Sequence, residues 1–201
     1  MSEFLTFVEL GFRHITDLAA MDHILFILVL AAIYRLRDWK DALWVVTAFT
    51  VGHSVTLALA VTGLIALPME VIEFLIPVTI VATGIENLLV GQRTQAPWGG
   101  RYRPVFAGVF GLVHGAGFAN YLRSLFMERI AVPLLGFNVG IELGQIVVLL
   151  AAVLLFAGLD RVLGTVRLPT RAPSPLRLRV VTVSSLVALI AAVWAVERSP
   201  W

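Results

Sequence analysis

Six apolar segments divide the chain, and they constrain its fold more than any other feature of the sequence. They cover residues 14–34, 41–63, 70–90, 104–122, 132–157 and 178–196. A helix of about 20 apolar residues crosses the hydrocarbon core of a bilayer. Because lipid offers the backbone no hydrogen-bond partner, each segment must satisfy its own N–H and C=O groups as a helix. The sequence predicts an all-α, polytopic integral membrane helical bundle of about six transmembrane helices, with a single domain over residues 1–201.

The composition supports this class of protein. Hydrophobic residues make up 59% of the chain and charged residues 14%, and the mean hydropathy is +0.93. Soluble domains carry about 25% charged residues, so we expect the surface of this protein to face the lipid bilayer. The sequence contains no cysteine, which excludes disulfides and thiolate metal ligands.

The distribution of basic residues predicts the orientation. Eleven of the 15 Lys and Arg residues lie in three loops, at 35–40, 91–103 and 158–179. The positive-inside rule places such loops in the cytoplasm. Both termini are therefore predicted to lie outside, in a multi-pass protein of the cytoplasmic membrane. Since topology accounts for the positive charge, we expect no nucleic-acid partner.

Polar side chains lie inside these apolar segments, where a charged group costs about 2.5–3.5 kcal/mol at the bilayer centre. The positions are His14, Asp17, Asp22, His23, His53, Glu73, His114, Asn138, Glu142 and Gln145. On the predicted topology they gather in the outer half of the membrane. We expect so many polar groups to face one another or a wet cavity. Glu86 is an exception, because it lies at the inner end of its segment and can reach cytoplasmic water.

The first segment leaves two arrangements open. At about 100° per residue, His14 and His23 point to opposite sides of an unbroken helix. Either the helix breaks near Asp17 to Asp22 and both imidazoles reach one site, or only one of them faces it. Asp22 and His23 themselves point in different directions. We expect one of these two to bind a ligand and the other to support the fold.

The other two histidines have distinctive neighbours. Thr50 and Thr56 lie three residues to either side of His53, and their hydroxyls could hold its second ring nitrogen. Glycines precede and follow His114, and they would let another helix approach closely beside the imidazole.

Imidazole nitrogens and carboxylate oxygens without sulfur are a donor set for Zn, Ni, Co, Fe or Mn. We predict a site for a divalent transition metal ion (Ni, Co or Zn), whose identity stays open. The predicted ligands are His14, Asp22, His23, His53, His114 and Glu142. The predicted supporting residues are Asp17, Glu73, Asn138 and Gln145. Any one histidine could instead be a hydrogen-bonding contact between helices, a use that membrane proteins also make of it.

Four stretches of the sequence carry a family resemblance. In chain order they are "GFRHITDLAAMDHILF", "FTVGHSVTLALA", "FGLVHGAGFA" and "FNVGIELGQ". With them the chain resembles the second branch of the HupE/UreJ family of bacterial membrane proteins, and it is similar to nickel and cobalt permeases. The resemblance implies a bacterial inner-membrane protein in an accessory pathway that supplies nickel to metalloenzymes such as hydrogenase and urease. His14, Asp22 and His23 match the His and Asp-His signature of that family.

Two short motifs predict an internal repeat. "FTVGHS" at 49–54 and "FNVGIE" at 137–142 share Phe, Val and Gly, and each follows a span that contains histidine. The first three and last three spans would then form a 3+3 inverted repeat, as in many secondary transporters.

Two functions fit these residues. The first, which the resemblance favours, is a permease with an intramembrane His and carboxylate site for a metal such as nickel or cobalt. The second is an intramembrane metal-dependent hydrolase, in which Glu73 or Glu142 activates water on a zinc-like ion facing the outer leaflet. Neither an HExxH nor a GxSxG motif supports the second. A metal-stabilised structural or sensing protein is a third hypothesis. The direction of transport and a homo-oligomeric state stay open.

Overall fold

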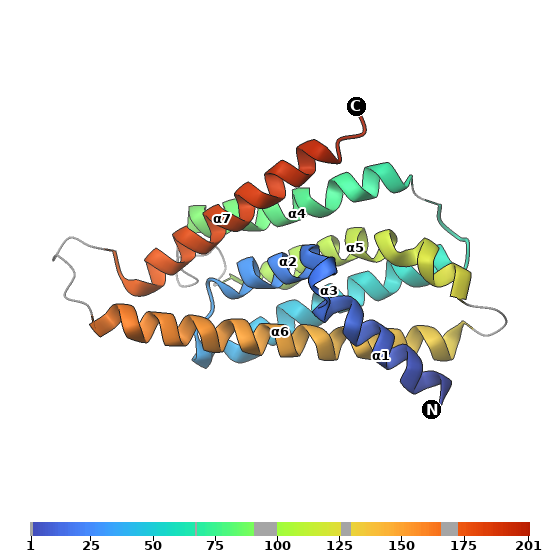
Figure 1. Cartoon of the computed structure of the whole chain (residues 1–201), viewed down its shortest axis with the longest axis horizontal. Coiled ribbons are helices and arrows are strands. Elements are labelled where there is room, and N and C mark those ends of the chain that lie inside the picture. Colours follow the sequence, from blue (N-terminus) through green and yellow to red (C-terminus); the bar gives the residue numbers. More distant parts are fainter. Residues whose placement is uncertain (1, 67, 91–99, 126–129, 166–172) are drawn as a thin grey trace.

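The protein is an elongated helical bundle (Figure 1). The computed structural model describes residues 2–66, 68–90, 100–125, 130–165 and 173–201, and these ranges contain no strand. The helices are α1 (Glu3–Thr16), α2 (Met21–Ala31), α3 (Trp39–Val61), α4 (Met69–Val90), α5 (Arg103–Leu125), α6 (Ala131–Thr165) and α7 (Pro175–Glu197). Two short 3₁₀ turns, Leu18–Ala20 and Leu36–Asp38, precede α2 and α3. The predicted all-α bundle is confirmed.

The predicted spans correspond to these helices with one change. α3, α4, α6 and α7 are each long and apolar enough to cross a membrane, and α1 with α2 adds a fifth candidate if the bent pair is one span. α5 covers the predicted span 104–122, but its glycines and polar residues make it less apolar than those four. The predicted span 14–34 begins inside α1 and crosses the break between α1 and α2.

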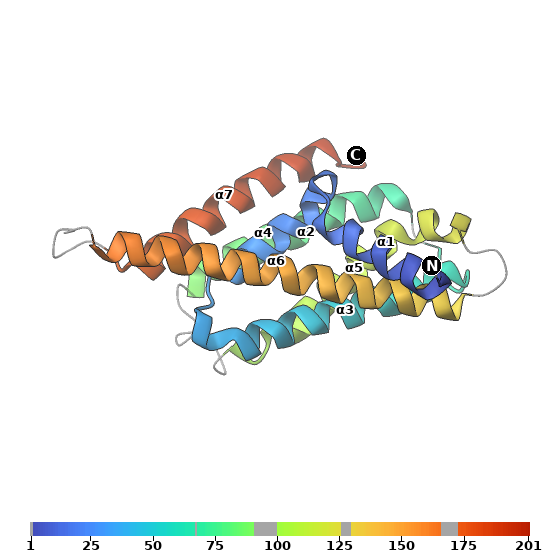
Figure 2. The same cartoon turned by 60° about the horizontal axis from the view of Figure 1, so that its bottom comes forward.

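The bundle is apolar both inside and outside, as a protein surrounded by lipid should be. Phe49, Phe137 and Ile141 are fully buried between helices. Leu150 and Leu154 of α6, in contrast, are 55% and 53% exposed. α6 has 35 residues and runs the whole length of the bundle (Figure 2). Its outward-facing leucines are therefore expected to contact acyl chains.

Glycine lets two helix pairs pack backbone against backbone. A Cβ added at Gly111 of α5 would lie 2.1 Å from the carbonyl oxygen of Phe49 in α3. A Cβ added at Gly11 of α1 would likewise lie 2.1 Å from the carbonyl oxygen of Phe137 in α6. No side chain fits at such distances, so both contacts require glycine. The predicted close approach beside His114 is confirmed, and the approaching helix is α3.

The contacts of the two halves of the chain repeat. Gly11 also faces the backbone nitrogen of Ile141, whereas Gly111 faces the backbone nitrogen of His53. α1 therefore packs on α6 as α5 packs on α3. α1 and α5 run in opposite directions along the bundle (Figure 1). This is the packing that an inverted repeat predicts.

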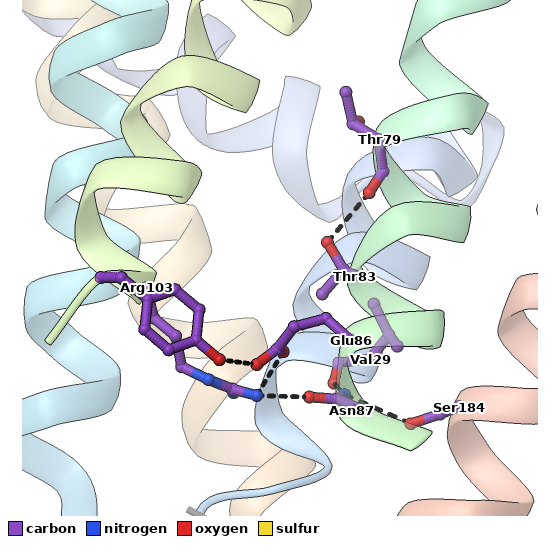
Figure 3. Close-up of polar contacts among 8 residues, drawn as sticks. Val29, Thr79, Thr83, Glu86, Asn87, Arg103 and Ser184 are labelled. Carbon is purple, nitrogen blue, oxygen red and sulfur yellow. Dashed lines mark hydrogen bonds and ion pairs between the residues drawn. The ribbon is translucent and has the colours of Figure 1, made fainter. Parts of the chain in front are cut away.

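A buried arginine joins α4 to α5 at the basic end of the bundle, which we define as the end where α4 and α6 finish and α5 and α7 begin. Arg103 donates to Glu86 and, at 2.9 Å, to Asn87 (Figure 3). Tyr102 also donates to Glu86, and burial raises the pKa of this phenol, which favours its protonated form. These two donors hold the Glu86 carboxylate, whose side chain remains 28% exposed.

Loss of this arginine should destabilise the fold. We expect Arg103→Met to lower the free energy of unfolding by about 3–5 kcal/mol, because it leaves a partly buried carboxylate without its cation. Thermal unfolding in detergent would measure the change. The control is Arg101→Met, since Arg101 is an exposed neighbour. Equal effects of the two substitutions would show that the ion pair contributes nothing.

Candidate metal centre

A break in the first predicted span brings two histidines together. α1 ends at Thr16, Asp17 takes an extended conformation, and α2 starts at Met21. The two helices are bent by 67°. As a result the ring centroids of His14 and His23 lie 4.7 Å apart. Of the two arrangements that the sequence left open, the structure shows the broken helix, with both imidazoles on one site.

His53 of α3 completes a group of three histidines. One ligand nitrogen from each of His14, His23 and His53 lies within 4.8 Å of the others, and among the described residues this is the one such group. His53 is fully buried, and neither of its ring nitrogens has a partner in the protein. The Nε2 atoms of His14 and His23 are also buried and unpaired. Buried polar atoms are normally hydrogen-bonded, so an unpaired group of nitrogens indicates a site for a ligand.

His114 of α5 lies beside this three-histidine group. Its ring centroid is 5.4 Å from that of His23, and its side chain is 2% exposed. Nε2 lies 2.9 Å from the hydroxyl of Thr79, while Nδ1 is buried without a partner. His114 is therefore near enough to be a fourth donor, although it lies outside the close group.

The two predicted carboxylate ligands are engaged elsewhere. Asp22 forms an ion pair with Arg198 at 3.2 Å. One oxygen of Glu142 accepts a hydrogen bond of 2.5 Å from Thr47, and the other is buried and unpaired. Neither belongs to the close group around His53. Of Asp22 and His23, the histidine thus faces the donor group, and the aspartate ties α2 to the end of α7.

The structure does not show the predicted hydroxyl partners of His53. The Thr50 hydroxyl lies 2.7 Å from Oε1 of Gln145, so it joins α3 to α6. Both ring nitrogens of His53 stay unpaired. The reason is geometric, because a side chain three residues away on a helix can reach a neighbouring helix as easily as its own.

The remaining supporting residues occupy different places. Asp17 is exposed at the end of α1, and Glu73 is exposed on α4. Asn138 of α6 has a buried, unpaired oxygen. Gln145 is 1% exposed and is held by Thr50. Of the four, only Glu73 lines a cavity with the histidines.

A cavity of about 420 Å³ adjoins the histidines. Its lining residues are His14, Ala20, Asp22, His23, Glu73, Ile76, His114, Gly117, Phe118 and Arg198. Glu73 lies near the start of α4 and Arg198 just beyond α7, so the cavity lies toward the end opposite the basic end. The cavity thus joins two carboxylates, Glu73 and Asp22, and the guanidinium of Arg198 to the imidazoles.

Comparison with known protein families gives a match to this chain. A family model described as HupE / UreJ protein matches residues 1–198. The chain belongs to the HupE/UreJ family. No curated protein and no solved structure matches it. In this HupE/UreJ protein the matched region contains all seven helices and every site residue from His14 to Arg198.

Sequence reasoning missed three residues of this HupE/UreJ site. Thr79 holds His114, Arg198 pairs with Asp22, and the ring of Phe118 lies 4.0 Å from that of His14. A buried threonine or phenylalanine in an apolar span has no sequence signal of its own. Arg198 could have been noticed as one of the few basic residues on the predicted outer side.

The donor set of the HupE/UreJ site is rich in nitrogen and lacks sulfur. Imidazole suits Zn, Cu, Fe and Ni, and divalent Co and Ni rank above Mn and Fe in general affinity. The residues present therefore fit a borderline divalent ion. With α1, α2 and α3 each giving one imidazole, a movement of any of these segments would change the coordination number.

Proposed function

We propose that this HupE/UreJ protein is a permease for a divalent transition metal, nickel or cobalt, and that the metal binds to His14, His23 and His53 on its way through the membrane. The three buried, mutually close and unpaired imidazoles carry the proposal. The association of the family with nickel and cobalt transport supports it. Both termini would lie outside the bacterial inner membrane, with the basic end in the cytoplasm.

The two ends of the bundle differ in a way that suits a transporter. Toward the outside, the cavity lined by Glu73 and Asp22 leads to the histidines. Toward the cytoplasm, Arg103 and Glu86 link α4 to α5. The repeated packing of the two halves fits alternating access, in which one half moves against the other around a central site.

Uptake into proteoliposomes tests this function. We expect His23→Ala to lower Co²⁺ or Ni²⁺ influx at least about 10-fold, because the loss of even a partner of a ligating histidine costs about 10- to 100-fold in metal affinity. Ile24→Ala is the matched control, since Ile24 is the next residue of α2 and lies outside the histidine group. Equal influx through His23→Ala and wild type would contradict the permease.

One observation favours the hydrolase as a second candidate. Three imidazoles beside a cavity that also contains a carboxylate, Glu73, provide the parts of a catalytic zinc site with an open position. Such an ion should stay bound at about one equivalent through purification. Metal analysis of the detergent-purified protein separates the two functions, because a transported ion should exchange and leave less than one equivalent.

A further inference from the structure

Thr79 makes a hydrogen bond that decides which nitrogen of His114 can bind a metal. Its hydroxyl lies 2.9 Å from Nε2 of His114 and 2.7 Å from the carbonyl oxygen of Ile76. A hydroxyl has one hydrogen, and a carbonyl can only accept. When the hydroxyl donates to Ile76, its oxygen accepts a hydrogen from Nε2 of His114, and the opposite tautomer would require the hydroxyl to give up its bond to Ile76.

The other nitrogen of His114 then keeps its lone pair. In a neutral imidazole one nitrogen carries a hydrogen and the other is an acceptor. Nδ1 of His114 is buried and has no partner in the protein. It is thus the one donor atom that this histidine can offer to a metal without breaking its bond to Thr79.

The surroundings of the ring limit its other orientations. His114 is packed against Phe49 at 5.0 Å and Phe26 at 5.6 Å between ring centroids. On another side His23 lies 5.4 Å away, edge to face. The imidazole also lines the same cavity as His14 and His23. Aromatic packing therefore confines the ring, and the hydroxyl of Thr79 supplies its polar anchor.

We propose that Thr79 is a positioning residue: it fixes the Nε2-protonated tautomer of His114, so that Nδ1 joins His14, His23 and His53 as a fourth nitrogen donor. The identity of the metal in this proposal rests on the proposed function. The tautomer of His114, in contrast, is a property of the metal-free protein. Removing a hydrogen bond to a ligating histidine typically costs about 10- to 100-fold in metal affinity. Thr79 acts only through His114.

Three variants of α4 isolate this hydrogen bond. Thr79→Val removes the hydroxyl and nearly keeps the shape, whereas Thr79→Ser keeps the hydroxyl. Thr83→Val is the matched control, because the Thr83 hydroxyl lies one turn further along and donates to the backbone carbonyl of Thr79 at 2.9 Å (Figure 3). That control removes a partly buried threonine hydroxyl bond of the same helix without touching an imidazole.

Two measurements are made on the full-length protein in detergent. Nitrogen-15 NMR of histidine-labelled, metal-free protein reports the tautomer of His114, and titration with Co²⁺ alone, followed by visible absorption, reports affinity and coordination. We expect wild type, Thr79→Ser and Thr83→Val to show hydrogen on Nε2 and the same Co²⁺ spectrum. Thr79→Val should show mixed tautomers, a changed spectrum and Co²⁺ binding weakened about 10- to 100-fold.

A hydrogen on Nδ1 of His114 in the wild type would overturn the proposal. This NMR measurement uses the wild-type protein alone, so it does not depend on whether a variant folds. An unchanged tautomer and Co²⁺ spectrum in Thr79→Val would overturn it as well. Failure of the proposed function would look different. Proteoliposomes that take up no Co²⁺, although the purified protein binds it and responds to Thr79→Val as expected, would refute the permease and support the role of Thr79.

Discussion

Replacement of His53 by leucine should abolish high-affinity Co²⁺ binding and leave the metal-free protein at least as stable as the wild type. The loss of affinity should be at least about 100-fold, because even the loss of a bond to a ligand can cost that much. The stability follows from burial, since both ring nitrogens of His53 are buried and unpaired. A buried polar group without a partner lowers the stability of the folded state by about 1–3 kcal/mol, and a leucine of similar volume removes that penalty.

Co²⁺ titration and thermal unfolding in the presence of a chelator would measure the two effects on one preparation. Ser54→Ala is the control, because the adjacent Ser54 hydroxyl bonds to the backbone of Thr50 and lies outside the histidine group. A purely structural role for His53 would give the reverse result, with stability lost and Co²⁺ binding kept. The combination of lost binding and kept stability is what distinguishes a binding residue from a packing residue.

Gly111→Ala should be one of the most damaging single-methyl changes in the bundle. The added Cβ would meet the carbonyl oxygen of Phe49 at 2.1 Å and the backbone nitrogen of His53 at 2.9 Å. Both are backbone atoms, which cannot move aside as a side chain can. α3 and α5 must then separate, and we expect the free energy of unfolding to fall by about 3 kcal/mol or more.

Gly158→Ala provides the matched control on α6. A Cβ added there has nothing within 4 Å, so stability should be unchanged or slightly higher. Unfolding of both variants in detergent can be followed by tryptophan fluorescence, as the chain has five Trp. Similar midpoints for the two variants would mean that the helices do not pack as closely as described. Because His53 is part of the contact, Gly111→Ala should also weaken Co²⁺ binding.

The sequence predicted the fold class because the controlling physics is local. A long apolar segment must become a helix in lipid whatever lies beside it. The histidines could be placed for the same reason, since every imidazole in an apolar span needs a polar partner. Glycine beside His114 predicted close packing, because small residues allow backbones to approach.

The details that depend on distant partners could not be predicted. The position of Asp22 beside His23 predicts a metal ligand, but its partner Arg198 is 176 residues away in the sequence. The break after Thr16 was only one of two open possibilities, since residues such as Leu and Ala continue a helix as readily as they interrupt one. Glu142 likewise bonds to Thr47 across a helix interface. Such pairings are set by tertiary packing.

The repeated contacts of Gly11 and Gly111 have an energetic consequence. When Gly11 is matched with Gly111, His14 of one half is equivalent to His114 of the other. In the same way, Ile141 occupies the position that is equivalent to His53. The first half of the chain thus contributes three imidazoles, one each from α1, α2 and α3, whereas the second half contributes His114 and the hydrocarbon side chain of Ile141. An ion bound beside these helices would therefore be held mainly by the first half, and the two halves would contribute unequally to its binding energy.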